Sequence, residues 1–253
     1  MKFSIIIPSY NQDQYIEHTF KNIKELKECA LEQNIVIEVL LFDSCSNEKV
    51  QNSIKKYEST FDYMEVKKDN GQYDAINKGL AKATGDYWSW LNTDDLIDIE
   101  GFLKIAAILK TDNTIDYIYG GVRYIDENGN SIKEVTANHF SLKTLVNNNP
   151  GIYQPGSFFK TNFTNKIGLL EKYNCCFDYE YVLRILKNKG KIKVCDFMVS
   201  NFRIHKASKT GSIIPIFVKE QLVISKKYGR NFFSKHTLIA NLRLFKHRYF
   251  IYQ

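Results

Sequence analysis

The chain has 253 residues, of which 44% are hydrophobic and 25% are charged. This composition excludes a disordered chain, a collagen-like repeat and a disulfide-stapled scaffold, and the length fits one large α/β domain with or without an appendage. The net charge of +7 is unevenly distributed: residues 201–253 hold 11 basic residues and a single acidic one, Glu220, whereas residues 1–200 hold 24 basic and 27 acidic residues.

Cysteine spacing and hydropathy indicate the cellular compartment in which the protein is expected. The five cysteines include neither a Cys-x-x-Cys pair nor a zinc-ligand spacing. The apolar stretch after Lys2 ends at Pro8 and is too short for a signal-peptide core. No window approaches the ~18 apolar residues of a membrane span. We therefore expect a reduced, cytoplasmic protein that does not cross a bilayer.

Strands and helices alternate through the first half of the chain. Apolar runs predict strands at Ser4–Ile7, Ile35–Phe42, Tyr63–Val66 and Asp86–Leu91. Helices are expected from a cap at Asp13 through Ala30, and at Asn47–Tyr57, Tyr73–Ala83 and Leu96–Lys110. This alternation predicts an α/β fold with a doubly wound, mostly parallel sheet.

The second half is less regular. A hairpin is expected from residues 116–125 and 131–136 around Asn128-Gly129, followed by a turn-rich stretch over 137–165. A helix at Asp178–Lys189 and a strand at Lys191–Asp196 complete the pattern. We expect one domain over residues 1–211, with a nucleotide-binding half (1–115) and a second-substrate half (116–211), and a helical tail over residues 212–253.

Polar residues follow three of the predicted strands. Ligands of open parallel sheets bind beyond the carboxyl ends of the strands. One aromatic ring and three carboxylates fall at such ends: Tyr10, Asp43, Asp94 and Asp95. They are therefore expected at one edge of the sheet.

Each of these residues also has an ordinary structural interpretation. Asp94 and Asp95 repel each other unless donors or a cation compensate, and hard divalent cations favour such oxygen-rich pairs. Either residue could instead cap the helix predicted from Leu96. Asp43 could cap its own loop, and Tyr10 could be a buried ring at a turn rather than a ring that stacks on a base.

Four segments in order resemble the family 2 glycosyltransferases, which have the glycosyltransferase A (GT-A) fold. The segments are Ser4–Asn11, Glu38–Asp43, the Asn-Gly-Gln-Tyr-Asp-Ala-Ile-Asn-Lys-Gly block within Asn70–Asp86, and Leu91–Asp95. The bacterial O-antigen, lipopolysaccharide and capsule enzymes are the most similar in pattern. The resemblance extends to about residue 210.

The resemblance implies roles at matching positions in the first half. Four residues would hold the nucleotide base: Pro8, Ser9, Tyr10 and Asp43. Asp94 and Asp95 would hold the ribose and a Mn²⁺ or Mg²⁺ ion on the donor diphosphate. Lys78 would contact the diphosphate, unless it is simply a solvated lysine on a helix.

The second half would supply the acceptor side. Residues 153–159 resemble the segment before the family's catalytic helix, and Cys176–Arg184 resembles its acidic motif, with Asp178 as the general base. An N-cap is the alternative for Asp178, and Glu180 is the weaker base candidate. His205 lies in an Arg-x-His-x-x-Ser element over Arg203–Ser208, which resembles a late element of the family and implies that His205 approaches the metal or the diphosphate. An exposed loop histidine is the alternative.

The resemblance implies an inverting, metal-dependent enzyme that moves one sugar from a nucleotide-diphosphate sugar, expected to be a UDP-sugar, to a lipid-linked glycan at the inner membrane face. The processive Gln-x-x-Arg-Trp signature is absent, which favours single-sugar addition. The loop after Asp43 departs from the family's glycine-rich pattern, with Glu48 as a substitute acid. A degenerate nucleotide-sugar-binding or scaffold protein is the alternative. A sugar nucleotidyltransferase would need a glycine-rich N-terminal loop that this chain does not have.

The basic tail carries two apolar stripes at helical spacing. The stripes comprise Ile214, Phe217, Val218, Leu222 and Tyr228, then Leu238, Leu242, Phe245, Tyr249 and Tyr252. A basic amphipathic helix can lie on an anionic bilayer as a peripheral contact. The stripes could equally pack on the domain or on a second subunit. A nucleic-acid partner is not expected, because no reading motif accompanies the charge.

Overall fold

The computed structural model describes residues 1–149, 151–152, 154–205 and 214–250. These residues form two compact units. The sheet unit comprises Met1–Ala137, Tyr153–Leu169 and Gly190–Ile204, and the helical unit comprises Asn138–Ile152, Leu170–Lys189 and His205–Gln253. Residues Tyr153, Lys206–Ser208 and Tyr252, which belong to predicted motifs, lie outside the described residues.

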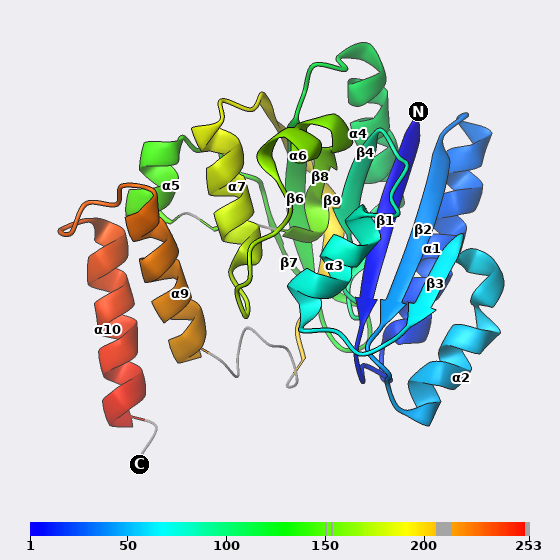
Figure 1. The fold of residues 1–253 in the computed structure, drawn as a ribbon, viewed down its shortest axis with the longest axis horizontal. Helices are drawn as coiled ribbons and strands as arrows, with labels where there is room; N and C mark the ends of the chain where they lie inside the picture. The colour runs from blue at the N-terminus through cyan, green and yellow to red at the C-terminus, as the bar shows by residue number, and fades with distance from the viewer. Residues whose placement is uncertain (150, 153, 206–213, 251–253) are drawn as a thin grey trace. The chain divides into compact units, whose positions relative to one another are not determined.

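A nine-stranded sheet forms the centre of the sheet unit (Figure 1). Its first half is parallel, in the order β3 (Tyr63–Val66), β2 (Val36–Asp43), β1 (Lys2–Ser9), β4 (Tyr87–Trp90). Its second half is mixed and continues with β8 (Ser157–Lys160), β6 (Tyr117–Ile125), β9 (Ile192–Arg203) and β5 (Leu96–Ile97), while β7 (Ser131–Val135) pairs with β6. The predicted α/β fold is confirmed, and the fully parallel pairing is confined to the first half.

Helices cover both faces of this sheet. Residue alternation along β1 points Phe3 to one face, where its ring packs on Phe102 of α4 (Ile99–Thr111) at 4.9 Å between centroids. Helix α1 (Ile16–Glu32) lies on the same face, and its apolar positions are buried as the sequence predicts. On the other face Ile6 lies under Gly79 of α3 (Gln72–Leu80), where a Cβ would come within 2.5 Å of Ile6. The glycine of the Asn-Lys-Gly block therefore allows the helix to approach the strand closely.

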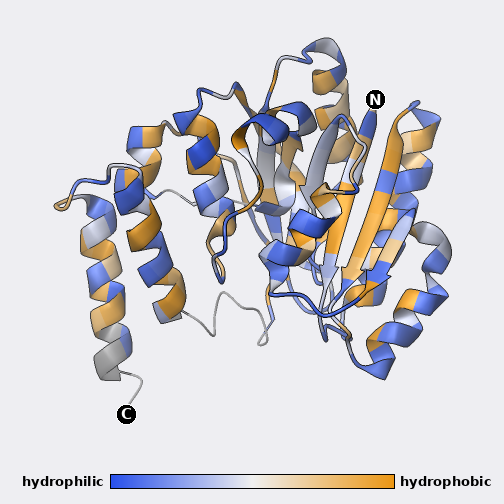
Figure 2. Ribbon diagram, viewed as in Figure 1, coloured by the Kyte–Doolittle hydropathy of each residue, from blue (hydrophilic) through white to orange (hydrophobic). Residues whose placement is uncertain are grey.

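The remaining elements of the sheet unit are short. They are α2 (Glu48–Lys56), η1 (Glu58–Thr60), η2 (Gln154–Gly156) and α6 (Thr161–Ile167). Helix α6 lies on the same face as α3, where Trp88 Nε1 donates a 2.7 Å hydrogen bond to Thr164 Oγ1. In Figure 2 the hydrophobic residues concentrate in the strands, most visibly in β1 and β2.

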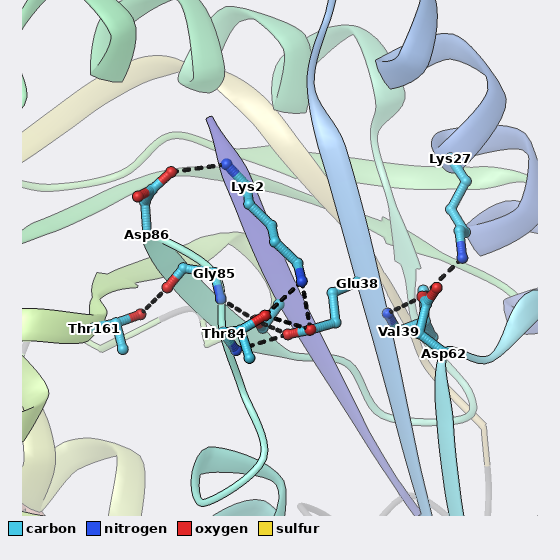
Figure 3. Close-up of polar contacts among 10 residues, drawn as sticks. Lys2, Lys27, Glu38, Val39, Asp62, Thr84, Gly85, Asp86 and Thr161 are labelled. Atoms are coloured by element: carbon cyan, nitrogen blue, oxygen red, sulfur yellow. Dashed lines mark hydrogen bonds and ion pairs between the residues drawn. The ribbon is translucent and has the colours of Figure 1, made fainter.

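The amino-terminal edge of the parallel half is held by a buried acid, Glu38 (Figure 3). Its carboxylate accepts hydrogen bonds from Lys2 Nζ at 2.6 Å, from Ser4 Oγ and from Thr84 N at 2.8 Å. Burial alone would raise the pKa of Glu38, but these donors outweigh it and lower the pKa to about 2. Glu38 therefore ties β1, β2 and the turn before β4 together at the end opposite to the predicted site.

Two predicted helix starts are wrong. Leu96 and Ile97 form β5, which pairs antiparallel with β9, and the helix begins at Ile99 after the N-cap Asp98. Asp13 does not cap α1, whose N-cap is Tyr15 without a side-chain hydrogen bond; Asp13 lies 3.6 Å from Lys49 instead. In both places, residues that the local sequence assigned to a helix start make contacts with distant parts of the chain instead: Leu96 and Ile97 with β9, and Asp13 with Lys49.

The helical unit contains α5 (Leu142–Asn148), α7 (Phe177–Lys187), α9 (Ile214–Lys227) and α10 (Lys235–Phe250). The two tail helices are thus present where the sequence predicts them. Val218 of the first stripe is buried, which supports packing of that stripe. Ile224 of α9, which is not part of the predicted stripe, is also buried. Leu238, Leu242 and Phe245 of α10 are each more than half exposed, so burial of that stripe is not observed at these three residues. No helix among the described residues has the length and hydropathy of a membrane span.

Candidate active site

Strand register brings the predicted donor residues to one edge of the sheet unit. Ser9 and Asp43 are paired at the carboxyl ends of β1 and β2, and Ser44 N donates to Ser9 O at 2.9 Å. Strand β4 lies on the other side of β1, and Leu91 N donates to Ile6 O before the chain turns through Asn92–Asp95. The expectation that three strand ends converge is therefore met.

Tyr10 is the most accessible of these residues. Its side chain is 67% exposed, so the alternative of a buried ring at a turn is wrong. The neighbouring Asn11 adopts a left-handed backbone (φ 50°), with its N–H donating to Ser46 Oγ and its Oδ1 accepting from Asn47 N at 2.8 Å. These bonds link the loop after β1 to the loop after β2 and leave the Tyr10 ring facing solvent, available for stacking.

Pro8 and Ser9 form the end of β1 beneath that ring. Pro8 is half-buried. Ser9 is buried, and its Oγ has no hydrogen-bond partner among the described residues. A buried hydroxyl without a partner at a strand end is an unusual cost in a folded protein.

Asp43 is committed to its own loop. Its Oδ2 accepts from Ser46 N at 2.8 Å and from Gln51 Nε2 at 2.6 Å, and its Oδ1 accepts from Ser46 Oγ. The loop-capping alternative for Asp43 is thus observed. These bonds shape the loop beside Tyr10, so Asp43 contributes to the edge of the site at least through the loop that it holds.

Asp95 is buried within the turn after β4. Only 1% of its surface is exposed; its Oδ1 accepts from Arg203 N at 3.1 Å and its Oδ2 from Asn92 Nδ2 at 3.0 Å. Burial first, and then the charge of Asp94, raise the pKa of Asp95 well above its usual range, against the opposing effect of the donors. Asp95 therefore anchors the acidic turn from inside.

Asp94 is the more accessible member of the pair. It is half-buried, and Gln12 Nε2 lies 3.5 Å from its Oδ2. Neither Asp94 nor Asp95 caps the following helix, because Asp98 does so with its side chain on Gly101 N at 2.9 Å. The capping alternative for the pair is therefore wrong.

Arg203 is a residue of this site that the sequence analysis did not single out. It is buried at the end of β9, and its Nε donates to Asp94 O at 3.0 Å while its Nη1 donates to Asp126 O at 3.0 Å. Its guanidinium lies 4.7 Å from the ring centroid of Tyr15. Arg203 thus fixes the acidic turn by side-chain and backbone contacts at once. Its place in the Arg-x-His element was the available signal.

Lys78 lies on α3, in the Asn-Lys-Gly block. Its Nζ is 3.4 Å from Asp74 Oδ2, one helical turn away, and the side chain is partly buried. At the start of the same helix, Gln72 Nε2 donates to Asn92 Oδ1 at 2.6 Å. The block therefore supports the acidic turn through Gln72, and a diphosphate contact by Lys78 stays a prediction.

Asp178 lies in the first turn of α7, in the helical unit. The N-cap of α7 is Cys176, so the N-cap alternative for Asp178 is wrong. Its Oδ1 accepts from Tyr179 N at 2.7 Å. Loss of solvent raises the pKa of Asp178 to about 6, and the charge of Glu220 adds to this rise. A carboxylate with this pKa is ionised at neutral pH yet basic enough to accept a proton.

Glu220 holds the turn that precedes Asp178. Its carboxylate accepts from Asn174 N at 2.7 Å, from Cys175 N at 3.0 Å and from Cys176 N at 3.2 Å. Among the described residues, Cys175, Cys176 and Glu220 are the one group with metal-ligand spacing. These backbone donors already occupy the carboxylate, so a structural role accounts for it.

Glu180 is the second carboxylate of this motif, and it is fully buried. Arg184 Nη2 donates to Glu180 Oε2 at 2.6 Å, and Tyr228 OH donates to its Oε1. These contacts join α7 to α9. They leave Glu180 poorly placed to serve as the base and agree with its lower ranking.

His205 is buried, so the alternative of an exposed loop histidine is wrong. It is the last described residue before 206–213, and its approach to a metal stays a prediction. The acidic pair fits a hard cation better than a soft one, because both side chains offer carboxylate oxygens and no sulfur.

A comparison with protein-family models decides the family. The model described as Glycosyl transferase family 2 matches residues 4–177, more than half of the chain. The chain belongs to glycosyl transferase family 2. The predicted glycosyltransferase is confirmed at this level, whereas the O-antigen and capsule type stays a prediction.

Relatives of this family-2 chain differ widely in length. An uncharacterized glycosyltransferase of Methanocaldococcus jannaschii is 23% identical over 210 residues, which cover 79% of this chain and 70% of the relative. An uncharacterized glycosyltransferase of Rickettsia felis is 35% identical over 136 residues, which cover 52% of this chain. The chain spans only 21% of the length of that relative.

Solved structures of glycosyltransferases share the fold. Staphylococcus aureus TarS 1–349 in complex with UDP-GlcNAc superposes with a TM-score of 0.69 at 18% identity, covering 96% of this chain and 70% of the TarS 1–349 chain. A mannosyltransferase of Pyrobaculum calidifontis in complex with GDP-Man and Mn²⁺ gives a TM-score of 0.62 at 17% identity, covering 96% of this chain and 69% of the other. The predicted GT-A fold is confirmed.

Proposed function

We propose that this family-2 chain is an inverting, metal-dependent glycosyltransferase that moves one sugar from a nucleotide-diphosphate sugar to a glycan acceptor. The observation that carries the proposal is the convergence of Tyr10, Ser9 and the Asp94–Asp95 turn at the carboxyl ends of adjacent parallel strands in a family-2 domain. This is the edge at which open α/β sheets bind nucleotides.

The donor would be held by the sheet unit. The exposed ring of Tyr10 offers a face to the base, and the unpartnered Ser9 Oγ offers a hydrogen bond nearby. Asp94 and Asp95 together would hold the ribose of the donor and the metal ion. TarS binds UDP-GlcNAc and the mannosyltransferase binds GDP-Man, and we propose a UDP-sugar as the donor of this chain.

A Mn²⁺ or Mg²⁺ ion would be held by Asp94, with Asp95 behind it and donor phosphate oxygens completing the ligand set. When bound, such an ion supplies charge stabilisation to the departing diphosphate. Mn²⁺ is present in the structure of the mannosyltransferase. For this chain the cation and a contribution of His205 are proposals.

Asp178 would act as the general base. Its carboxylate takes the proton of the attacking acceptor hydroxyl, and the hydroxyl oxygen forms a bond to the anomeric carbon from the face opposite the diphosphate. The bond between that carbon and the diphosphate oxygen breaks, and the nucleoside diphosphate leaves with the electron pair. The anomeric centre is inverted in the product. The pKa of about 6 suits this task at neutral pH.

We further propose a lipid-linked glycan acceptor in surface polysaccharide synthesis, with the enzyme held beside the membrane by its basic tail. The charge distribution supports this, since residues 201–253 carry 11 basic residues and only one acidic residue. A basic surface is attracted to the anionic inner leaflet, where a lipid-linked acceptor would lie.

Thermal unfolding in the presence of UDP-, GDP- and dTDP-sugars with Mn²⁺ or Mg²⁺ tests the donor. A ligand that binds only the folded chain raises the unfolding temperature. Release of nucleoside diphosphate from the stabilising donor then tests catalysis, with Asp178→Asn as the variant expected to bind but not react. A donor that binds without turnover under any condition would instead favour a nucleotide-sugar-binding or scaffold protein.

A further inference from the structure

Helix α10 turns two of its leucines to solvent. Among its described side chains, His236, Thr237 and Ala240 are buried, and Ile239 and Leu244 are partly buried. By contrast, Leu238 is 63% exposed and Leu242, one helical turn on, is 53% exposed. An amphipathic surface helix normally places its leucines inward. The reversed orientation leaves a leucine stripe that the described residues do not cover.

Specific polar contacts fix this orientation. His236 Nδ1 hydrogen-bonds Val146 O of α5 at 3.0 Å, and its ring meets the Tyr179 ring edge-on at 6.4 Å between centroids. At the start of the helix, Thr237 N donates to Ser234 Oγ at 3.2 Å. Turning the leucines inward would break the His236 contacts with Val146 and Tyr179, so the exposure of the leucines is a determined feature of the helical unit.

The turn before α10 presents two aromatic rings next to the stripe. Phe232 is 73% exposed and Phe233 is 91% exposed, and the two rings pack edge to face at 5.2 Å. The turn itself is held firmly, because Asn231 N donates to Asn147 Oδ1 of α5 at 2.8 Å and Phe233 N donates to Asn231 Oδ1 at 2.9 Å. Two ordered, adjacent phenylalanines in solvent are typical of an interaction site.

Basic side chains accompany the apolar ones. Lys235 and Arg243 are exposed on α10; Lys235 lies three residues before Leu238, and Arg243 directly follows Leu242. The one acidic residue in 201–253, Glu220, spends its carboxylate on the backbone of Asn174–Cys176. The surface thus combines leucine and phenylalanine with the positive charges of Lys235 and Arg243 (Figure 2 shows the hydropathy of α9 and α10).

This charge pattern distinguishes between two possible partners. A symmetric dimer would apply the same surface to itself and bring Lys235 and Arg243 of both copies together, with no acid of the tail to neutralise them. An anionic bilayer satisfies both components, because its acyl region takes the apolar side chains and its headgroups take the cations.

We propose that the tail surface, comprising Phe232, Phe233, Leu238 and Leu242 with Lys235 and Arg243, binds an anionic lipid bilayer. The proposal rests on the membrane contact put forward under the proposed function and names the surface that makes it. The phenylalanines enter the interface at the turn, and α10 lies along the membrane with its leucines downward.

Co-sedimentation with vesicles tests this surface. Vesicles of phosphatidylcholine with phosphatidylglycerol are expected to bind the chain, and vesicles of phosphatidylcholine alone to bind it at least about tenfold more weakly, with loss of binding in high salt. The double variant Phe232→Ser with Phe233→Ser, and separately Lys235→Glu with Arg243→Glu, should each lower the partition coefficient about tenfold or more.

Matched controls come from α1 of the sheet unit. Leu31 is 68% exposed and Lys24 is exposed, so Leu31→Ser and Lys24→Glu repeat the chemistry at another surface and should leave binding unchanged. Circular dichroism and unfolding temperature verify that each variant is folded. Equal losses in the control variants would overturn the assignment of this surface.

Two further outcomes would contradict the proposal. If the chain binds neither vesicle type but forms a dimer, and the double variant Phe232→Ser with Phe233→Ser is monomeric, the surface binds a second copy of the chain instead. If it ignores vesicles and stays monomeric, the lipid assignment is wrong. Donor turnover in solution is measured separately. Vesicle binding without turnover would refute only the proposed glycosyltransferase activity, and turnover without vesicle binding would refute only the proposed membrane-binding role of the tail surface.

Discussion

Protonation of Asp178 gives the sharpest test of the proposed base. Loss of solvent holds its pKa at about 6, so about nine-tenths of the molecules carry the ionised base at pH 7 and about one-tenth at pH 5. A general base works only when ionised. We therefore expect kcat/KM to fall about tenfold per pH unit below pH 6, with a plateau above pH 7.

Two substitutions test whether that pH dependence comes from Asp178. Asp178→Asn should lower turnover by about 10²–10⁴-fold and remove the acid limb from whatever activity is left. Glu220→Gln removes a negative charge that raises the pKa of Asp178, so the acid limb should move to lower pH. Glu171→Gln is the matched control, because Glu171 pairs with Lys227 in the same unit and is not among the groups that shift Asp178.

The assay is release of nucleoside diphosphate between pH 5 and 8 in buffers of constant ionic strength. Donor binding, followed by thermal shift at each pH, separates a failure of chemistry from a failure of binding. A flat profile across this range would refute the reasoning. So would an unchanged acid limb in Asp178→Asn, or equal shifts in Glu220→Gln and Glu171→Gln.

Three further predictions follow from the sheet unit. Tyr10→Ala should weaken nucleotide binding about tenfold, as measured by calorimetry, while the unfolding temperature stays within error because the ring is 67% exposed. Asp95→Ala should remove both activity and the response to Mn²⁺ or Mg²⁺; an active variant that resists chelation would exclude the metal role. Glu38 has a lowered pKa, so its stabilisation of about 2–3 kcal/mol is complete above pH 4.5 and is lost as the pH falls towards 2. Glu38→Gln should unfold at lower urea at pH 7 and show a flatter loss of stability between pH 4.5 and 3; a loss as steep as in the unchanged chain would count against this account.

Local pattern was sufficient for much of the fold. The apolar spacing from Ile16 to Ala30 located α1, and the run around Val39 located β2, because each buries a face that its own sequence defines. The ends of these strands then placed Tyr10 and the Asp94–Asp95 pair at one edge. These conclusions needed only periodicity and the known geometry of parallel sheets.

Long-range contacts account for what local pattern missed. The local sequence predicted that Leu96 and Ile97 begin a helix, but they pair with residues of β9 about a hundred positions later in the chain. Arg203 N reaches Asp95 across 108 positions, a contact that no local spacing reveals. In α10 the leucine period predicted the helix correctly, but the contacts of His236 with Val146 and Tyr179 decide which side faces inward.

The tie between Arg203 and the acidic turn has a consequence for the order of events during synthesis. The turn at Asp94–Asp95 leaves the ribosome early, but two of its hydrogen bonds come from Arg203 at the end of β9. Until residue 203 has emerged and β9 has docked beside β6, Asp95 has its Asn92 donor but not the backbone donor of Arg203. A nascent chain stopped at residue 115 would contain every predicted contact to the base and the ribose and still lack the hydrogen bonds from Arg203.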